Sequence, residues 1–315
     1  MDVLELVKVH GSIREASRQS GVSYSTLYGQ YKRAQFCQKK AISESHGSLL
    51  NRIKLVHERP TKVLYFTDAH DRIDQSKERF LWLGKLARDT NPDIIINGGD
   101  TFDVDSLNAH VRNETYEGRM KPGFEKELSS LAEAFRLFDV HCPKHIPLHI
   151  VLGNHEQRIW RYENQNPEVY GMLSAAFLSL LERHRYQVTK FKYYLDIEGV
   201  EFIHAVINAM SREVGGKGAA SNIATNSLKD IVYGHSHKKE EMTVAKMGPN
   251  NRSVRAVNGG CFMNDGYRMD YAKCSANVWD YGCMEIMICG GKIESTNWIS
   301  MKELARRYGN DSEDL

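Results

Sequence analysis

The segment Asp93–Asp103 reads DIIINGGDTFD, a run of three isoleucines that ends in two glycines and a carboxylate. Consecutive β-branched residues favour a short buried strand, and the glycines allow a sharp turn at its end. Four other apolar runs follow the same plan, at residues 63–67, 146–152, 200–206 and 231–234. Helical patterns at 77–89 and 125–140 alternate with these runs, which indicates an α/β domain.

Polar side chains stand at or near the carboxyl end of every run. They are Asp68 and His70, Asp100 and Asp103, Asn154 and His155, His204, and His235 with His237. In an open α/β sheet, ligands bind beyond the carboxyl ends of the strands, so we expect these groups to converge on one crevice. Each is weak evidence alone, because a histidine after a strand is more often an ordinary polar residue than a ligand.

In chain order the sequence carries Asp-x-His, Gly-Asp-x-x-Asp, Gly-Asn-His-Glu, a strand histidine and Gly-His-x-His. This order is similar at every block to the five-block signature of the calcineurin-like metallophosphoesterases, over about residues 63–260. One difference is Ala205, because glycine usually follows the fourth-block histidine. The resemblance implies a four-layer αββα sandwich, two β-sheets flanked by helices, with a metal site at one edge.

The resemblance also implies a two-metal site whose ligands follow by position. The first metal would be held by Asp68, His70 and His237, and the second by Asn154, His204 and His235. Asp100 would bridge them. Two ions about 3.5–4 Å apart supply a nucleophile and clamp the phosphoryl oxygens of a phosphate ester. Mixed imidazole and carboxylate ligands select first-row metals, so we expect two divalent ions, Mn²⁺ first, with Fe or Zn as alternatives.

Three further residues are expected to take part in catalysis. His155 matches the family's non-ligand histidine, which steadies the phosphate and protonates the leaving group. Asp103 would orient or polarise that imidazole. Arg158, three residues beyond His155, is a candidate phosphate contact, with a surface ion pair as the alternative.

The first 35 residues show the pattern of three short helices, at 3–9, at Ile13–Ser20 and from about residue 24 to 35. Ser12 and Ser23 stand where N-caps are expected, and Gly21 breaks the second helix. The stretch GSIREASRQSGVSYSTLYGQYKR resembles the helix-turn-helix of resolvase-like DNA-binding domains. The alternative is a three-helix cap without DNA contact. The residues expected near DNA are Ser23, Tyr24, Ser25, Thr26, Lys32 and Arg33.

Basic charge is concentrated at the front of the chain. Residues 1–60 contain ten Lys/Arg and five Asp/Glu, whereas the remaining 255 residues contain 32 and 35. This asymmetry favours DNA as a partner. The sequence predicts a helix-turn-helix domain at 1–35, a linker at 36–60, a phosphoesterase domain at 61–300, and a C-terminal helix with an acidic tail at 301–315.

Composition narrows the class of protein. With 41% hydrophobic and 26% charged residues the chain is globular, and it shows neither an apolar run of about 18 residues nor a secretory signal. Six scattered cysteines without a CxxC pair indicate a reducing compartment rather than a disulfide scaffold. We therefore expect a cytoplasmic protein without a membrane partner. Assembly into a homo-oligomer is an open alternative.

The leading hypothesis is a two-metal hydrolase that cleaves phosphodiester bonds in DNA, docked by its N-terminal domain. GDTFD and the general layout resemble the branch of the family that includes the DNA-repair nucleases. GNHE also occurs in the family's protein phosphatases, so a phosphoprotein or nucleotide phosphatase is the alternative. A non-catalytic DNA-binding regulator ranks lower, because every ligand position holds a competent residue type.

Overall fold

The computed structural model describes residues 6–7, 9, 12–28, 30, 50–53, 59–111, 114–248, 252–269 and 278–309. The chain divides into two compact units, Met1–Leu49 and Leu50–Leu315. The larger unit contains two β-sheets with helices, and the described part of the smaller unit contains helices at residues 13–20 and 24–28. No helix among the described residues has both the length and the apolar character that a membrane span needs.

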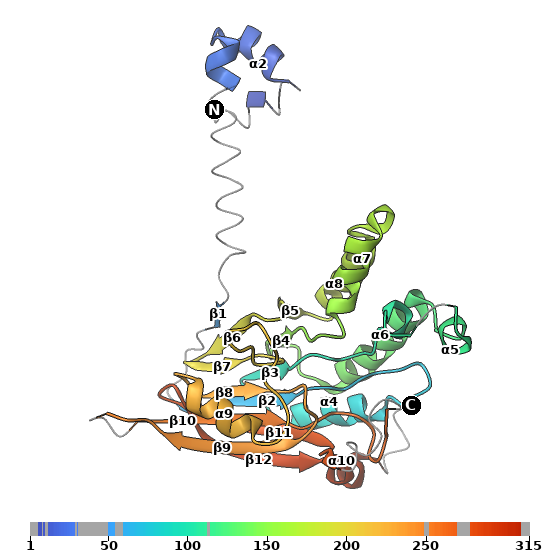
Figure 1. Cartoon of the computed structure of the whole chain (residues 1–315), viewed down its shortest axis with the longest axis vertical. Helices are drawn as coiled ribbons and strands as arrows, with labels where there is room; N and C mark the ends of the chain where they lie inside the picture. Colours follow the sequence, from blue (N-terminus) through green and yellow to red (C-terminus); the bar gives the residue numbers. More distant parts are fainter. Residues whose placement is uncertain are drawn as a thin grey trace. The chain divides into compact units, whose positions relative to one another are not determined.

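Over the described residues, each sheet of the larger unit has six strands. Figure 1 shows how the strands are arranged. The first has the order β12-β11-β2-β3-β4-β5, with bounds Lys292–Ser300, Gly282–Cys289, Thr61–Phe66, Ile94–Asn97, Leu148–Val151 and Tyr186–Thr189. The second has the order β1-β6-β7-β8-β10-β9, with bounds Leu50–Ile53, Tyr194–Ile197, Val200–Phe202, Ile231–Tyr233, Ser253–Gly259 and Lys239–Ala245. Both sheets are mixed, since β2 is parallel to β3 but antiparallel to β11, and β10 is parallel to β8 but antiparallel to β9.

Alternation along β2 explains why the two sheets stack. Val63 and Tyr65 belong to a buried cluster that also contains residues of the second sheet, such as Phe202. Leu64 and Phe66 belong to a different cluster, formed with helices α4 (Glu78–Thr90) and α6 (Phe124–His141). Because successive side chains of a strand point to opposite faces, β2 joins the sheet-to-sheet core to the sheet-to-helix core.

Helices cover the outer faces of both sheets. On the first sheet, α4 packs against α6 and against α10 (Met301–Tyr308), while α8 (Met172–Arg183) contacts β5. On the second sheet, α9 (Ala219–Asn226) contacts β9 and β10. This order of helix, sheet, sheet and helix confirms the predicted four-layer α/β sandwich. The other described helices of this unit are η1 (Asp105–Leu107), α5 (Tyr116–Arg119), α7 (Gln157–Gln165) and η2 (Pro167–Val169).

The predicted elements of this unit are present, with one difference. Each of the five apolar runs contains a strand, namely β2, β3, β4, β7 and β8, and both predicted helices appear as α4 and α6. Part of the predicted linker instead forms β1, which pairs in parallel with β6. A four-residue strand at the edge of a sheet gives too little periodicity to be recognised in the sequence. The predicted acidic tail lies, from residue 310 onward, outside the part of the chain that the structure describes.

In the smaller unit, α2 spans Ile13–Ser20, the bounds that the sequence predicts. Ser12 Oγ accepts a hydrogen bond from the Glu15 amide at 3.1 Å, and Gly21 ends the helix with a φ of 70°. Residues 24–28 are also helical. Ser23, Tyr24, Ser25 and Thr26 are exposed, whereas Lys32 and Arg33 lie outside the described residues.

At Gly84, helix α4 lies directly against the backbone of helix α6. A methyl group at this position would overlap the carbonyl oxygen of Phe138, which cannot move unless the helix moves. In an exposed helix, replacing glycine by alanine stabilises by about 1 kcal/mol. We predict the opposite sign for Gly84→Ala, a loss of about 1–3 kcal/mol in the free energy of unfolding, because the interior would be overpacked. Urea titration followed by circular dichroism measures this difference.

Gly215→Ala is the control for this prediction. Nothing lies within 4 Å of a methyl group at residue 215, and its backbone is outside the left-handed region. Its stability should therefore equal or slightly exceed that of the wild type. If Gly84→Ala proves as stable as Gly215→Ala, the close packing of α4 on α6 is wrong.

Candidate metal centre

The polar residues at the strand ends come together from both sheets. Asp68 and His70 follow β2, Asp100 follows β3 and Asn154 follows β4, all in the first sheet. His204 follows β7, and His235 with His237 follows β8, in the second sheet. Asp68, His70, Asp100, His204 and His237 are at most 5% exposed. The stacked sheets therefore place the predicted ligands at one common edge.

Asp68, His70 and His237 form a first group, whose candidate ligand atoms all lie within 4.8 Å of one another. His237 Nε2 is 3.1 Å from Asp68 Oδ1 and 3.1 Å from His70 Nε2. His70 Nδ1 is 2.6 Å from Asp103 Oδ1. Because Nδ1 faces that carboxylate, Nε2 is the nitrogen of His70 that faces the group.

Asp100, His204 and His235 form a second group, whose candidate ligand atoms also lie within 4.8 Å of one another. His204 Nε2 is 3.1 Å from Asp100 Oδ2 and 3.1 Å from Asn154 Oδ1, so the predicted amide ligand lies beside this group. Asp100 Oδ2 is also 4.0 Å from His70 Nε2 of the first group. Asp100 therefore lies between the two groups.

The chemistry of these atoms fits a pair of cations. Nε2 of His70, Nε2 of His237 and Oδ1 of Asp68 converge in a buried space, and all three are atom types that bind metal cations. Burying such donors without a compensating charge is unfavourable. Mixed nitrogen and oxygen donors suit divalent first-row metals. The residues present thus fit a dimetal centre.

The carboxylates of the cluster are held in their charged form. Burial tends to raise the pKa of Asp68, but hydrogen bonds with His237 and His70 outweigh it, and the pKa is lowered. Burial likewise opposes ionisation of Asp100, yet the neighbouring charges of His204 and His155 lower its pKa well below the usual value. Burial lowers the pKa of His70, whereas the charge of Asp103 and its hydrogen bond raise it, with a net rise to about 10.

The backbone that carries these side chains is strained. Asp68, His70, Asp100, His235 and His237 all have positive φ, between 43° and 70°. Non-glycine residues adopt this conformation at a cost of order 1–3 kcal/mol each, and it concentrates at functional sites. Hydrogen bonds between two loops hold part of this strained backbone in place. The amides of residues 68, 70 and 71 donate to the carbonyl oxygens of residues 99, 100 and 101, respectively, at 2.7–2.9 Å.

Gly153 and Gly234 allow the loops to close around the carboxylates. A methyl group at residue 153 would overlap Asp100 Oδ1, and one at residue 234 would overlap Asp68 Oδ2. The main chain at both positions therefore approaches the candidate ligands so closely that only glycine fits without displacement. These two glycines are part of the site's geometry as well as of its turns.

Glu156 supports the site and was not recognised from the sequence. It is fully buried, and its carboxylate accepts hydrogen bonds from the amides of Asp100, Thr101 and Gly153 at 3.0, 2.6 and 2.8 Å. Burial, with the charge of Asp100 second, raises its pKa. Its place in the GNHE motif is the one sequence signal that it gave. Glu156 joins the loops that follow β3 and β4.

His155 lies at the centre of a polar network with Asp103 and Arg158. His155 Nδ1 is 3.1 Å from the carbonyl oxygen of Asp103 and 3.3 Å from its carboxylate. Arg158 donates from Nη1 to the same carbonyl at 2.7 Å, and its Nη2 is 3.3 Å from His155 Nε2. The Arg158 side chain is 14% exposed, lines the cavity and also lies 3.8 Å from Asp105 Oδ1, with which it forms a partly buried ion pair.

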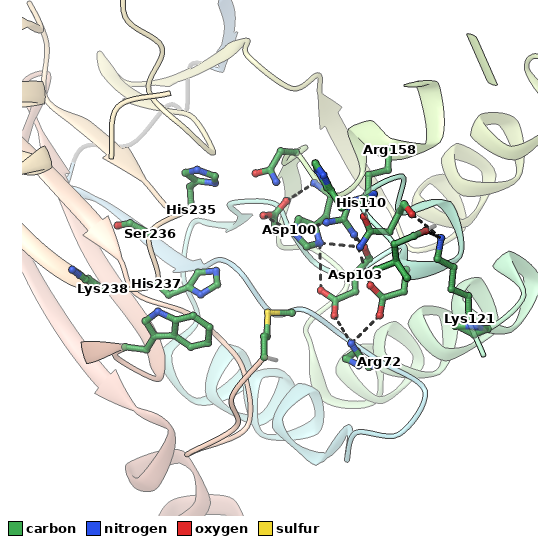
Figure 2. A pocket seen from close by; sticks show the side chains of 18 of the residues that line it. Arg72, Asp100, Asp103, His110, Lys121, Arg158, His235, Ser236, His237 and Lys238 are labelled. Atoms are coloured by element: carbon green, nitrogen blue, oxygen red, sulfur yellow. Dashed lines mark hydrogen bonds and ion pairs between the residues drawn. The ribbon is translucent and has the colours of Figure 1, made fainter. Parts of the chain in front are cut away.

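A cavity of about 950 Å³ opens over the metal centre. Figure 2 shows His235 and His237 on one wall, with Asp103 and Arg158 across from them. Arg72 is a further cation of the site that the sequence did not reveal, and it donates to Asp105 at 2.8 Å and to Asp103 at 3.3 Å. Other lining residues are Met120, Lys121, Lys238, Met269 and Trp279.

Several solved structures are similar to this chain at low sequence identity. A predicted phosphoesterase from Streptococcus pneumoniae is 10% identical, with 78% of this chain and 92% of that chain covered and a TM-score of 0.30. A purple acid phosphatase from yellow lupin (Lupinus luteus) seeds is 12% identical, with 79% and 55% covered and a TM-score of 0.40. A dimetal phosphatase from Danio rerio is 9% identical, with 78% and 97% covered and a TM-score of 0.36.

No curated protein matches the sequence significantly. The family model described as calcineurin-like phosphoesterase, in contrast, matches residues 61–239. This range covers more than half of the chain and includes every candidate metal-binding group found among the described residues, from Asp68 to His237. Together with the two stacked mixed sheets, the match shows that the chain belongs to the calcineurin-like phosphoesterase family.

Proposed function

We propose that this protein is a nuclease, a two-metal enzyme that hydrolyses phosphodiester bonds in DNA. Its family consists of hydrolases that act on phosphoester bonds and use a dimetal centre. The observation that carries the proposal is the position of Asp100, which belongs to one candidate ligand group, lies 4.0 Å from His70 of the other and accepts a hydrogen bond from the His155 amide. The finer assignment, DNA as substrate, is supported by the cavity and by the N-terminal unit.

In the proposed centre, one metal would be held by Asp68, His70 and His237 and the other by Asn154, His204 and His235, and Asp100 would be shared by both. Mn²⁺ is the proposed metal, with Fe or Zn as alternatives. When bound, the pair supplies a nucleophile at neutral pH and neutralises the phosphoryl oxygens. The chain keeps the seven ligands in place through the hydrogen-bonded loops and through Glu156.

His155 is the proposed general acid. Its Nδ1 is engaged with Asp103, so Nε2 is the nitrogen left to hold a proton for the leaving oxygen. Asp103 orients the ring through its carbonyl and carboxylate oxygens and also contacts His70. Arg158, fixed by the Asp103 carbonyl, is the proposed phosphate contact beside Nε2.

The cavity suits a substrate larger than a phosphate group. Its volume of about 950 Å³ is at the upper end for ligand pockets. Arg72, Arg158 and Lys238 supply positive charge for phosphates along its walls, and Trp279 with Met269 supplies an apolar surface for a base. A nucleic-acid strand, with charge and aromatic rings in alternation, matches this combination better than a small phosphomonoester does.

The N-terminal unit is the proposed DNA-binding module. We propose a helix-turn-helix at 1–35, joined through 36–60 to the phosphoesterase domain, with Ser23, Tyr24, Ser25 and Thr26 facing DNA together with Lys32 and Arg33. Supporting features are the Ser12 cap, the left-handed Gly21 and the exposed residues 23–26. The excess of basic residues in 1–60 favours the same partner.

Substitution at the bridge and at the acid is predicted to have different consequences. Asp100→Asn should lower both metal content and turnover, because it removes the anion between the two groups. His155→Ala should keep about two Mn²⁺ per chain but lower turnover by about 10²–10⁴-fold, the usual contribution of a general acid. Metal content is measured by plasma mass spectrometry, and turnover with bis(p-nitrophenyl) phosphate and single-stranded DNA.

His145→Ala is the matched control, because His145 is an exposed histidine outside the cavity. It should behave as the wild type. Wild-type protein that hydrolyses p-nitrophenyl phosphate but neither diester would contradict the nuclease proposal and favour a phosphatase. Wild-type protein with neither metal nor turnover would contradict the proposed enzyme itself.

Removal of the smaller unit is predicted to separate DNA binding from chemistry. Deletion of residues 1–49 should weaken binding to duplex DNA by at least about tenfold and reduce its salt dependence, because basic contacts to phosphates are lost. Hydrolysis of bis(p-nitrophenyl) phosphate should stay unchanged. Fluorescence anisotropy at several salt concentrations measures the affinity. An unchanged affinity with an unchanged salt slope would show that the helix-turn-helix proposal is wrong.

A further inference from the structure

We propose that Glu213 is a positioning residue of the second metal position, where its carboxylate holds Nε2 of His235 so that Nδ1 of the same ring is presented to the metal. Glu213 belongs to none of the five sequence blocks, because it lies between the fourth, at His204, and the fifth, at residues 234–237. The inference rests on the proposed metal centre and adds to it a residue that acts through a ligand.

The contact between the two side chains is direct. Glu213 Oε2 is 3.2 Å from His235 Nε2, with the two side chains 35% and 28% exposed. A carboxylate oxygen only accepts, so in the proposed arrangement His235 Nε2 is the atom that carries the proton. With Nε2 engaged in this way, Nδ1 is the ring atom left to join the group that His235 forms with Asp100 and His204.

Two further candidate ligand histidines, His70 and His204, also have one ring nitrogen held by an oxygen atom and the other facing the metal centre. His70 has its Nδ1 at 2.6 Å from Asp103 Oδ1, which leaves Nε2 for the first group. His204 has its Nδ1 at 2.8 Å from the carbonyl oxygen of Gly98, which leaves Nε2 beside Asp100. Metal-binding histidines generally donate their second ring N–H to a carboxylate or carbonyl, which fixes the ring and raises its basicity. Glu213 completes this plan for His235, with the two nitrogens exchanged.

A short hairpin delivers Glu213 to this place. After β7 and His204 the chain turns back, and Ile207 pairs with Glu213 in an antiparallel bridge. The Val214 amide donates to the Val206 carbonyl at 2.8 Å, and the Asn208 side chain accepts from two amides within the turn at 2.9 and 3.0 Å. One segment therefore supplies a ligand, His204, and returns to hold the next ligand, His235.

The competing interpretation is a partly exposed ion pair without effect on the metal. Such pairs contribute about 0–1 kcal/mol to stability, so stability alone does not separate the two interpretations. Metal affinity does, because loss of a carboxylate that orients a ligand lowers metal affinity by about 10–100-fold. The measurement must also resolve the two metal positions from each other.

The test uses the full-length protein freed of metal and titrated with Mn²⁺, with free Mn²⁺ followed by electron paramagnetic resonance. We expect two sites in the wild type. Glu213→Ala should weaken one of them by about 10–100-fold and leave the other unchanged. Glu213→Gln should lie in between, because its amide oxygen still accepts the hydrogen bond. Glu182→Gln is the matched control, an exposed glutamate on α8 that should change neither site.

The outcomes are distinguishable. Two wild-type sites with unchanged affinities in Glu213→Ala, or with both sites weakened equally, would overturn the positioning role and leave the proposed function intact. A wild type without two sites would overturn both proposals. If Glu213→Ala melts at a lower temperature than the wild type without metal, Glu213→Gln carries the test. In the Zn²⁺-loaded wild type, nitrogen NMR should show a protonated Nε2 in His235, and a metal-bound Nε2 would overturn the inference.

Discussion

A buried carboxylate, that of Asp100, is the constraint on which the rest of this structure depends. It is 2% exposed, accepts the amide of His155 at 2.8 Å and lies 3.1 Å from the His204 ring. A buried anion is costly unless positive charge and hydrogen bonds compensate it. The chain meets this requirement with imidazoles from both sheets, with Glu156 holding the surrounding amides, and with Gly153, where a side chain would displace the carboxylate.

The same requirement accounts for the architecture. The candidate ligands come from loops at the carboxyl ends of strands in two sheets, so they come together only when the sheets stack. The core between the sheets, including Val63 and Phe202, therefore determines the distance between Asp100 and His204. Left-handed residues such as Asp68 and His235 persist because this packing and the loop hydrogen bonds hold them.

Local signals in the sequence were sufficient for much of this account. Runs such as IIIN, followed by a glycine turn and a carboxylate, indicated both the strand and the ligand at its end. Contacts between residues far apart in the sequence could not be predicted from such local patterns. Glu156 reaches the Asp100 amide across 56 residues, and Glu213 meets His235 only because a hairpin returns it. The strand β1 is short and at an edge, so its pairing with β6 gave no periodic signal.

Anomalous diffraction from crystals of the protein soaked in Mn²⁺ can show whether two metals share Asp100. We predict two anomalous peaks about 3.5–4 Å apart, the spacing of paired metals in phosphoryl-transfer sites. Asp100 should contact both peaks, with Asp68 beside one and His204 beside the other. A single peak, or two peaks that do not share Asp100, would contradict the account.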